Sequence, residues 1–225
     1  MAIALLEYAL QLLYPPKCIV CRRVLQRQET DLCHRCREAM SSWQAPERNG
    51  EFFKVCIPSF YYQDALRQSV LRYKFESMRH YAGGYGRMMA MTLQRRDMVD
   101  FDLVTWVPVS KKRRRRRGYD QAQLLAQALA RELKLPVGQT LRKIRDNPPQ
   151  SSLQGAARRK GNVIGMYVTT GTAVTGLRVL LVDDVITTGA TLSECSRMLC
   201  TAGAKEVICA TLAATPIAKE QVTIE

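Results

Sequence analysis

Residues 178–192 read Arg-Val-Leu-Leu-Val-Asp-Asp-Val-Ile-Thr-Thr-Gly-Ala-Thr-Leu, and this stretch decides the fold. Val179–Val182 is a short apolar run, typical of a strand buried on both faces, and we expect the two aspartates that follow to end it. Small residues then lead into a helical apolar pattern. Backbone N–H groups in such a loop can point around an anion, and a helix N-terminus also favours negative charge. The stretch predicts a strand, an anion-binding loop and a helix.

The acid pair and the hydroxyl-rich loop resemble the phosphoribosyl pyrophosphate (PRPP) site of type I phosphoribosyltransferases. The resemblance implies that Asp183 and Asp184 meet the ribose hydroxyls and that Mg²⁺ accompanies PRPP. It assigns the 5-phosphate to the loop residues Thr187, Thr188, Gly189, Ala190 and Thr191. An ordinary strand-to-helix turn with two capping aspartates is the simpler alternative.

Two details of this stretch have alternatives. Thr191 and Glu194 fit a capping box for the helix, although Thr188 is also placed to start it. A Walker B strand would show a similar acid, but it needs a Walker A partner. Gly171 and Gly176 have the Walker A spacing, yet Leu-Arg follows them instead of Lys and Ser or Thr.

The composition indicates a globular protein with polyanionic ligands. The chain has 225 residues, is 47% hydrophobic and carries a net charge of +14. Excess positive charge favours nucleic acid, anionic lipid or phosphorylated metabolites. No apolar run reaches membrane-spanning length, so we expect no integral membrane segment. Residues 1–14 carry Glu7 and lack a basic leader, which predicts an amphipathic packing helix, not a signal peptide, and a cytoplasmic protein.

Four of the eight cysteines form two Cys-x-x-Cys pairs near the N-terminus. Each pair can clamp one side of a tetrahedral ion, which predicts a structural zinc site made by Cys18, Cys21, Cys33 and Cys36. Redox disulfides are the rival, which a reducing compartment disfavours. Catalytic zinc is disfavoured because four thiolates leave no open position for water. His34 lies between the second pair and is left out of the ligand set.

Positive charge is clustered in the middle of the chain. Seven basic residues follow the predicted strand Phe101–Val109 and precede a predicted helix, which places them at the ligand-binding edge of an α/β sheet. A solvated surface is the common explanation for such a run, but adjacent like charges also favour anion binding. Lys74, between two aromatic residues, and Tyr119 are further candidates for contacts with DNA. The predicted DNA-binding set is Lys74, Lys111, Lys112, Arg113, Arg114, Arg115, Arg116 and Tyr119.

Strands and helices alternate through residues 52–225, which predicts an α/β domain with a mostly parallel sheet flanked by helices. Residues 1–45 form a second unit with the amphipathic helix and zinc ribbon, and residues 41–51 are interpreted as a linker. Helices are expected over residues 64–75 and 81–95, and residues 151–162 as a lid. Pyrophosphate or another anion is assigned to Arg117, Gly118, Arg158 and Arg159.

The order of these motifs resembles the ComF family. It runs from the double Cys-x-x-Cys through Val107-Pro108-Val109 and Arg117–Ala122 to Gln150, the following arginines and the PRPP motif. The resemblance implies a zinc ribbon on a phosphoribosyltransferase core that hands incoming single-stranded DNA to the recombination machinery with a helicase-like partner. Tyr119-Asp120 stands where Phe-Asn is commoner in the family. An active phosphoribosyltransferase that transfers ribose 5-phosphate to an unidentified acceptor is the alternative.

Overall fold

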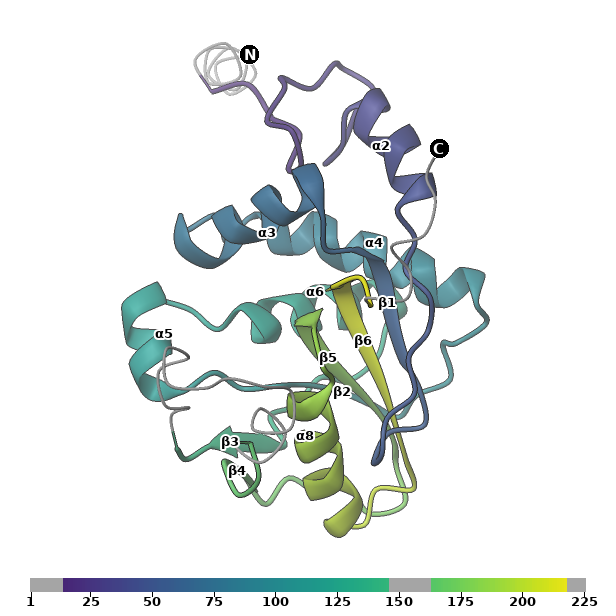
Figure 1. The fold of residues 1–225 in the computed structure, drawn as a ribbon, viewed down its shortest axis with the longest axis vertical. Coiled ribbons are helices and arrows are strands. Elements are labelled where there is room, and N and C mark those ends of the chain that lie inside the picture. Colours follow the sequence, from purple (N-terminus) through teal and green to yellow (C-terminus); the bar gives the residue numbers. More distant parts are fainter. Residues whose placement is uncertain (1–13, 146–162, 218–225) are drawn as a thin grey trace, which may run out of the picture.

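Four parallel strands form the central sheet in the order β1-β6-β5-β2 (Figure 1). The computed structural model describes residues 14–145 and 163–217. The strands are β1 (Cys56–Tyr61), β2 (Leu103–Trp106), β5 (Arg178–Ile186) and β6 (Glu206–Ala214). Because all four run the same way, the loops after them gather at one edge of the sheet. The predicted mostly parallel α/β fold is confirmed.

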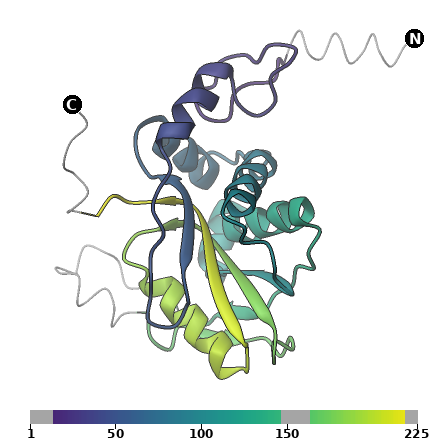
Figure 2. The same cartoon turned by 90° about the vertical axis from the view of Figure 1, so that its right-hand side faces the viewer.

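Helices cover both faces of the sheet (Figure 2). Leu180 and Val182 of β5 belong to one core, and Val179 and Leu181 belong to the other, as the period of two in a strand requires. On the first face lie α3 (Asp64–Phe75), α4 (Tyr81–Arg95) and α6 (Gln121–Leu133). On the second lie α8 (Ala190–Thr201) and a small antiparallel sheet of β3 (Leu141–Lys143) and β4 (Tyr167–Thr169).

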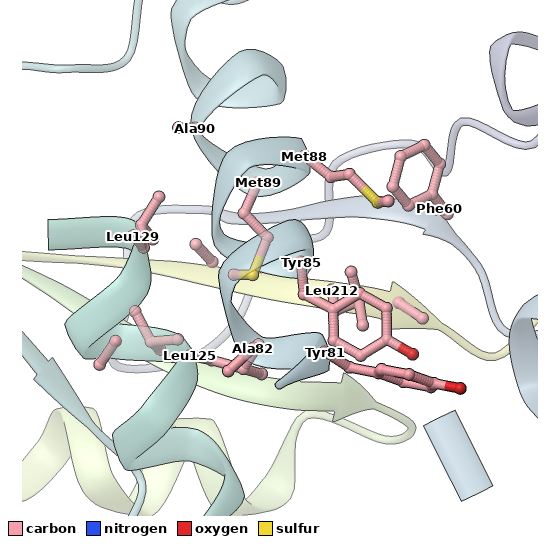
Figure 3. Packing of buried hydrophobic residues seen from close by; sticks show 14 of the residues in the cluster. Phe60, Tyr81, Ala82, Tyr85, Met88, Met89, Ala90, Leu125, Leu129 and Leu212 are labelled. Atoms are coloured by element: carbon pink, nitrogen blue, oxygen red, sulfur yellow. The ribbon is translucent and has the colours of Figure 1, made fainter. Parts of the chain in front are cut away.

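The helical layer depends on a close contact between α4 and α6. Tyr85 and Met89 of α4 lie in the same cluster as Leu125 and Leu129 of α6 (Figure 3). A Cβ atom on Gly86 would lie 2.5 Å from the Cβ atom of Ala128, so only glycine permits this approach. The residues of α3 and α4 were predicted as helices over the same ranges, because their apolar spacing is regular.

Strand β5 does not end at the aspartates, and the expectation that it would is wrong. The pairing with β6 continues from Asp183 opposite Thr211 to Ile186 opposite Ala214. The backbone hydrogen bonds of the ladder thus override the unfavourable strand propensity of aspartate. Both carboxylates are therefore held on a regular strand at its carboxyl end.

The basic run forms a helix of its own, α5 (Lys111–Arg117), where sequence reasoning expected only a basic connection. The hydroxyl of Ser110 accepts a hydrogen bond from Arg113 N and so caps the helix. Gly118 ends it in the left-handed conformation at φ 77°. All seven cationic side chains are thereby displayed on one short, compact element beside the end of β2.

The start of α8 differs from the predicted capping box. Gly189 is the N-cap residue, with φ 78°, and its side chain can make no cap bond. Glu194 instead accepts hydrogen bonds from Gly165 N and from the guanidinium of Arg197. The Thr191–Glu194 capping box is therefore wrong, because Glu194 is recruited to the neighbouring chain segment before β4.

The expected linker, residues 41–51, has defined structure over part of its length. Gln44 and Arg48 form antiparallel bridges with Phe60 and Cys56 of the edge strand β1. Pro58 is tolerated in β1 because an edge strand does not need every outward N–H group. The segment runs beside the sheet and carries Arg48 to the loop after β5.

Candidate functional site

The four paired cysteines converge in space, as the spacing predicted. Their sulfur atoms all lie within 4.8 Å of one another, and the Sγ atoms of Cys21 and Cys33 are 3.5 Å apart. These separations fit a tetrahedral ion with metal–sulfur bonds of about 2.3 Å. His34 is exposed and faces Glu38, 3.2 Å away, which agrees with its omission from the ligand set. The thiolate set suits structural zinc.

The cysteine module is fixed to the helical layer by polar contacts. Ser69 of α3 donates a hydrogen bond to Ile19 O, and the guanidinium of Arg72 donates to Val20 O. Arg87 of α4 binds both oxygens of Asp31 at 2.7 Å. The module begins α2 (His34–Ser42) directly after its third cysteine. Helices α3 and α4 therefore hold the loop of the cysteine cluster against the larger domain.

The acid pair lies at the carboxyl end of β5 and is shielded from water. The side chain of Asp184 is 13% exposed, and Asp184 N donates to Asp183 Oδ1 at 2.8 Å. Burial and then the neighbouring Asp184 carboxylate raise the pKa of Asp183 to about 8. The Asp183 carboxyl is thus harder to ionise than an exposed aspartate, and the site favours a cation or hydroxyl groups beside the acid pair.

Lys74 supplies that cation. Its Nζ atom lies 2.7 Å from Asp184 Oδ1, and its side chain is 18% exposed. Burial alone would lower the pKa of Lys74, but Asp184 outweighs it and the pKa is raised, so the ammonium stays charged. The predicted role of Lys74 as a DNA contact is not what the structure shows, because its ammonium points into the acid pair.

The loop after β5 keeps its backbone donors available. Within the described residues, the N–H groups of Thr187, Thr188 and Gly189 have no hydrogen-bond partner. Thr187 and Thr188 are exposed. A cavity of about 500 Å³ borders the loop at Thr188, Gly189 and Ala190. Unpaired N–H groups before a helix start can bind an oxyanion.

Arg48 holds this loop from outside, and sequence reasoning missed it. Its guanidinium donates to Thr187 O at 3.0 Å and also to Thr215 O after β6. These two carbonyl groups belong to neighbouring strand ends, so Arg48 ties the ends together. No sequence signal marks it, because it lies among polar residues of the expected linker.

Arg117 of α5 lies close enough to the acid pair for its guanidinium to interact electrostatically with Asp184. It is half-buried, its Nη1 atom donates to Gln121 Oε1 at 2.8 Å, and its Nε atom has no partner among the described residues. Burial lowers the pKa of Arg117, Asp184 opposes this shift, and Arg113 and Arg116 add to it. An anion between the arginines and the loop would relieve this unfavourable environment.

Tyr119, predicted to contact DNA, is buried in the structure. It is 5% exposed, and its hydroxyl donates a hydrogen bond to Tyr73 O. The ring is packed against Tyr73 and under the Arg79 guanidinium, so it is not available to stack on a DNA base. Asp120 accepts from Val109 N at 3.0 Å and caps α6 through Gln123 N, which gives the carboxylate a structural role.

Three of the remaining basic residues of α5, namely Lys111, Lys112 and Arg115, line a cleft, and Arg113, Arg114 and Arg116 are not among its walls. Residues 111–116 are all exposed. A cavity of about 630 Å³ separates α5 from β3, and no acidic residue is among those that line it. Its walls are Ser110, Lys111, Lys112, Arg115, Arg142, Lys143, Ile144 and Arg145. Arg142 and Arg145 were not predicted, although basic residues at the end of a strand were a visible signal. Arg158 and Arg159 lie outside the described residues.

Two family models match the chain, a double zinc ribbon domain over residues 9–47 and a phosphoribosyl transferase domain over residues 120–224. The fold and the site therefore define a phosphoribosyltransferase-type protein with an N-terminal zinc ribbon. Within the described residues, no helix is long and apolar enough to cross a membrane.

Relatives of similar length narrow the class further. The chain is 28% identical to Competence protein F of Haemophilus influenzae over 215 residues, covering 85% of this chain and 93% of that protein. It is 26% identical to Competence protein ComFC of Bacillus subtilis over 202 residues, with 85% and 81% covered. It is 29% identical to DNA utilization protein YhgH of Salmonella typhimurium over 211 residues, with 87% and 90% covered. These homologues, 26–29% identical over most of the chain, support the resemblance to the ComF family.

Proposed function

We propose that this protein binds PRPP at the end of β5 and handles single-stranded DNA during DNA uptake. The observation that carries the proposal is the pairing of two anion-binding features at one sheet edge. The free N–H groups of the loop at Thr187–Gly189 follow β5, and the exposed cations of α5 follow its neighbour β2. Loops after parallel strands collect at this edge, where α/β proteins bind ligands.

PRPP carries groups that complement the hydrogen-bond donors and acceptors of the site. Its 5-phosphate would accept hydrogen bonds from the loop N–H groups, and its ribose hydroxyls would donate to the oxygens of Asp183 and Asp184. Arg117 and Gly118, at the carboxyl end of α5, are assigned to the pyrophosphate. Carboxylate oxygens suit Mg²⁺ as ligands, but one oxygen of Asp184 is already bonded to Lys74.

The basic cleft between α5 and β3 is the proposed path for the DNA backbone. Lys111, Lys112 and Arg115 form one wall and Arg142 and Arg145 the other. Helix α5 suffers repulsion between like charges three and four residues apart, a few tenths of a kcal/mol for each pair. Bound phosphates would remove that repulsion, and the number of phosphates neutralised would determine the salt dependence.

Two titrations test the proposal. Calorimetry should detect PRPP binding to the wild-type protein and its loss in Thr188→Asp, which places a carboxylate at the phosphate. Labelled single-stranded DNA should bind at low salt, and Arg142→Ala with Arg145→Ala should reduce the slope of log K against log salt by up to about 0.7 for each phosphate that is no longer neutralised. Arg131→Ala, with Arg131 on α6 and outside the cleft, is the control for each of the single variants Arg142→Ala and Arg145→Ala. No heat with PRPP, or an unchanged salt slope, would refute the respective half.

An active transferase is the second candidate, and the environment of Arg117 favours it. A half-buried guanidinium with an unpaired Nε atom can stabilise a departing pyrophosphate. The reaction would break the bond between the anomeric carbon and pyrophosphate and form one to an acceptor nucleophile. Release of pyrophosphate with any base or amine, abolished in Asp184→Asn, would establish it.

We also expect a helicase-like partner and a cytoplasmic location, to be tested by co-purification and cell fractionation.

A further inference from the structure

The ion pair between Lys74 and Asp184 occupies the place where phosphoribosyltransferase chemistry calls for a cation. The two atoms are 2.7 Å apart, and both side chains are less than one-fifth exposed. A single ammonium is here brought from α3 onto the end of β5. The contact is thus built into the fold and is not a chance encounter of flexible surface groups.

The position of Lys74 is fixed by its neighbours on α3. The preceding residue, Tyr73, is fully buried and donates a hydrogen bond from its hydroxyl to Gln121 O at 2.8 Å. Arg72 is bonded to Val20 O in the cysteine module. The residues before Lys74 are thus anchored at two separate places, which fixes the backbone from which the lysine side chain reaches the acid pair.

The acid pair keeps two oxygen atoms for a ligand while this ion pair is intact. Asp183 Oδ1 accepts from Asp184 N, and Asp184 Oδ1 accepts from Lys74. Within the described residues, the Oδ2 atoms of Asp183 and Asp184 have no hydrogen bond. A vicinal diol presents two hydroxyl groups, each able to donate or to accept, so it can bind these two atoms without displacing the lysine, whether or not Asp183 is protonated.

We propose that the Lys74 ammonium replaces a protein-bound divalent cation at the acid pair, so that this chain binds the ribose diol of PRPP without Mg²⁺. The inference rests on the proposed function and names the cation of the same site. It disagrees with the Mg²⁺ that the resemblance implied. A divalent ion at Asp184 would have to displace an ammonium that is already desolvated and paired, and the repulsion between the two cations opposes this.

The first test uses the unmodified protein. PRPP is titrated by calorimetry in excess EDTA and again in excess Mg²⁺, and we expect the dissociation constant to change by less than about threefold, because the ammonium already neutralises Asp184. In Lys74→Met the same comparison should show a dependence on Mg²⁺ of at least about tenfold, since the carboxylate has lost its partner. Lys74→Arg should remain independent of Mg²⁺.

The second test does not need PRPP. Mn²⁺ is added to the ligand-free protein, and the signal of free Mn²⁺ is followed by electron paramagnetic resonance. Lys74→Met should gain a Mn²⁺ site that the wild-type protein lacks. Lys54→Met is the matched control, because the exposed Lys54 pairs with Glu206 at the opposite end of the sheet's β6 strand.

The results that would overturn the role of Lys74 differ from those that would refute PRPP binding. Loss of PRPP binding in EDTA by the wild-type protein would overturn the inference, and so would a Lys74→Met variant that behaves like the wild type in both tests. Absence of PRPP binding under every condition would refute the proposed function instead. In that case a Mn²⁺ site confined to Lys74→Met would still show that the lysine takes the cation's place.

Discussion

Replacing Arg48 by Met removes the tie between the phosphate loop and the neighbouring strand end while keeping an unbranched side chain. In the wild-type protein the guanidinium donates to Thr187 O at 3.0 Å and to Thr215 O, and the second bond is partly buried. The substitution leaves both carbonyl groups without this donor. We expect two effects, a loss of stability and a loss of affinity for PRPP.

The size of each effect follows from these hydrogen bonds. A hydrogen bond to a charged donor contributes about 1.5–3 kcal/mol when buried, and the exposed bond to Thr187 contributes less. We therefore expect the free energy of unfolding to fall by about 2–3 kcal/mol. A loop that must be ordered by the ligand reduces the net binding energy, and a tenfold weaker affinity corresponds to about 1.4 kcal/mol.

The assay combines urea denaturation with PRPP calorimetry, and Arg96→Met is the matched control. Arg96 holds the same segment through Glu47 at 2.9 Å and Ala45 O at 3.0 Å but does not touch the phosphate loop. The control should lose a similar amount of stability and retain its PRPP affinity. If both variants lost affinity equally, or neither did, Arg48 would have no specific effect on the loop and the reasoning would fail.

Three further predictions concern the metal, pH and packing. Cys33→Ser should lose about one zinc per chain by elemental analysis, whereas Cys200→Ser, outside the cluster, should retain it; retention by both would contradict the site. Burial raises the pKa of the Asp183 carboxyl to about 8, so the folded protein loses stability as the pH rises through that value and the carboxyl ionises. Asp183→Asn should therefore raise Tm at high pH and not at acidic pH. The same gain at every pH would argue against titration of Asp183. Gly86→Ala should cost about 1–3 kcal/mol in urea denaturation by overpacking, and Gly83→Ala, where the nearest atom is 3.7 Å away, should not destabilise.

The sequence identified those parts of the fold that depend on local patterns. The helices over Asp64–Phe75 and Tyr81–Arg95 follow from apolar residues at helical spacing, and the strand before the acid pair from its unbroken apolar run. The four cysteines converge because each Cys-x-x-Cys turn is a local structure. Such features need only the residues within a few positions of each other.

What could not be predicted depends on residues far apart in the chain. Lys74 and Asp184 are 110 positions apart, and nothing near either residue indicates the ion pair. The continuation of β5 through the aspartates depends on the register with β6. Tyr119 was predicted to contact DNA, yet the chain before α6 turns its ring into the core. In each case tertiary contacts determine the role of the side chain.

Helix α3 connects the two functional parts of the molecule. Arg72 binds the carbonyl group of Val20 beside the clustered cysteines, and Lys74, two residues later, binds Asp184 in the acid pair. A rigid helix transmits a displacement at one residue to its near neighbours, because its backbone hydrogen bonds fix their spacing. A zinc ribbon that orders the chain around Val20 therefore also holds Lys74 at the site. We therefore expect the ribbon to brace the residue that neutralises the acid pair of the phosphoribosyltransferase-type domain, which is a physical reason for the small module to be joined to this domain.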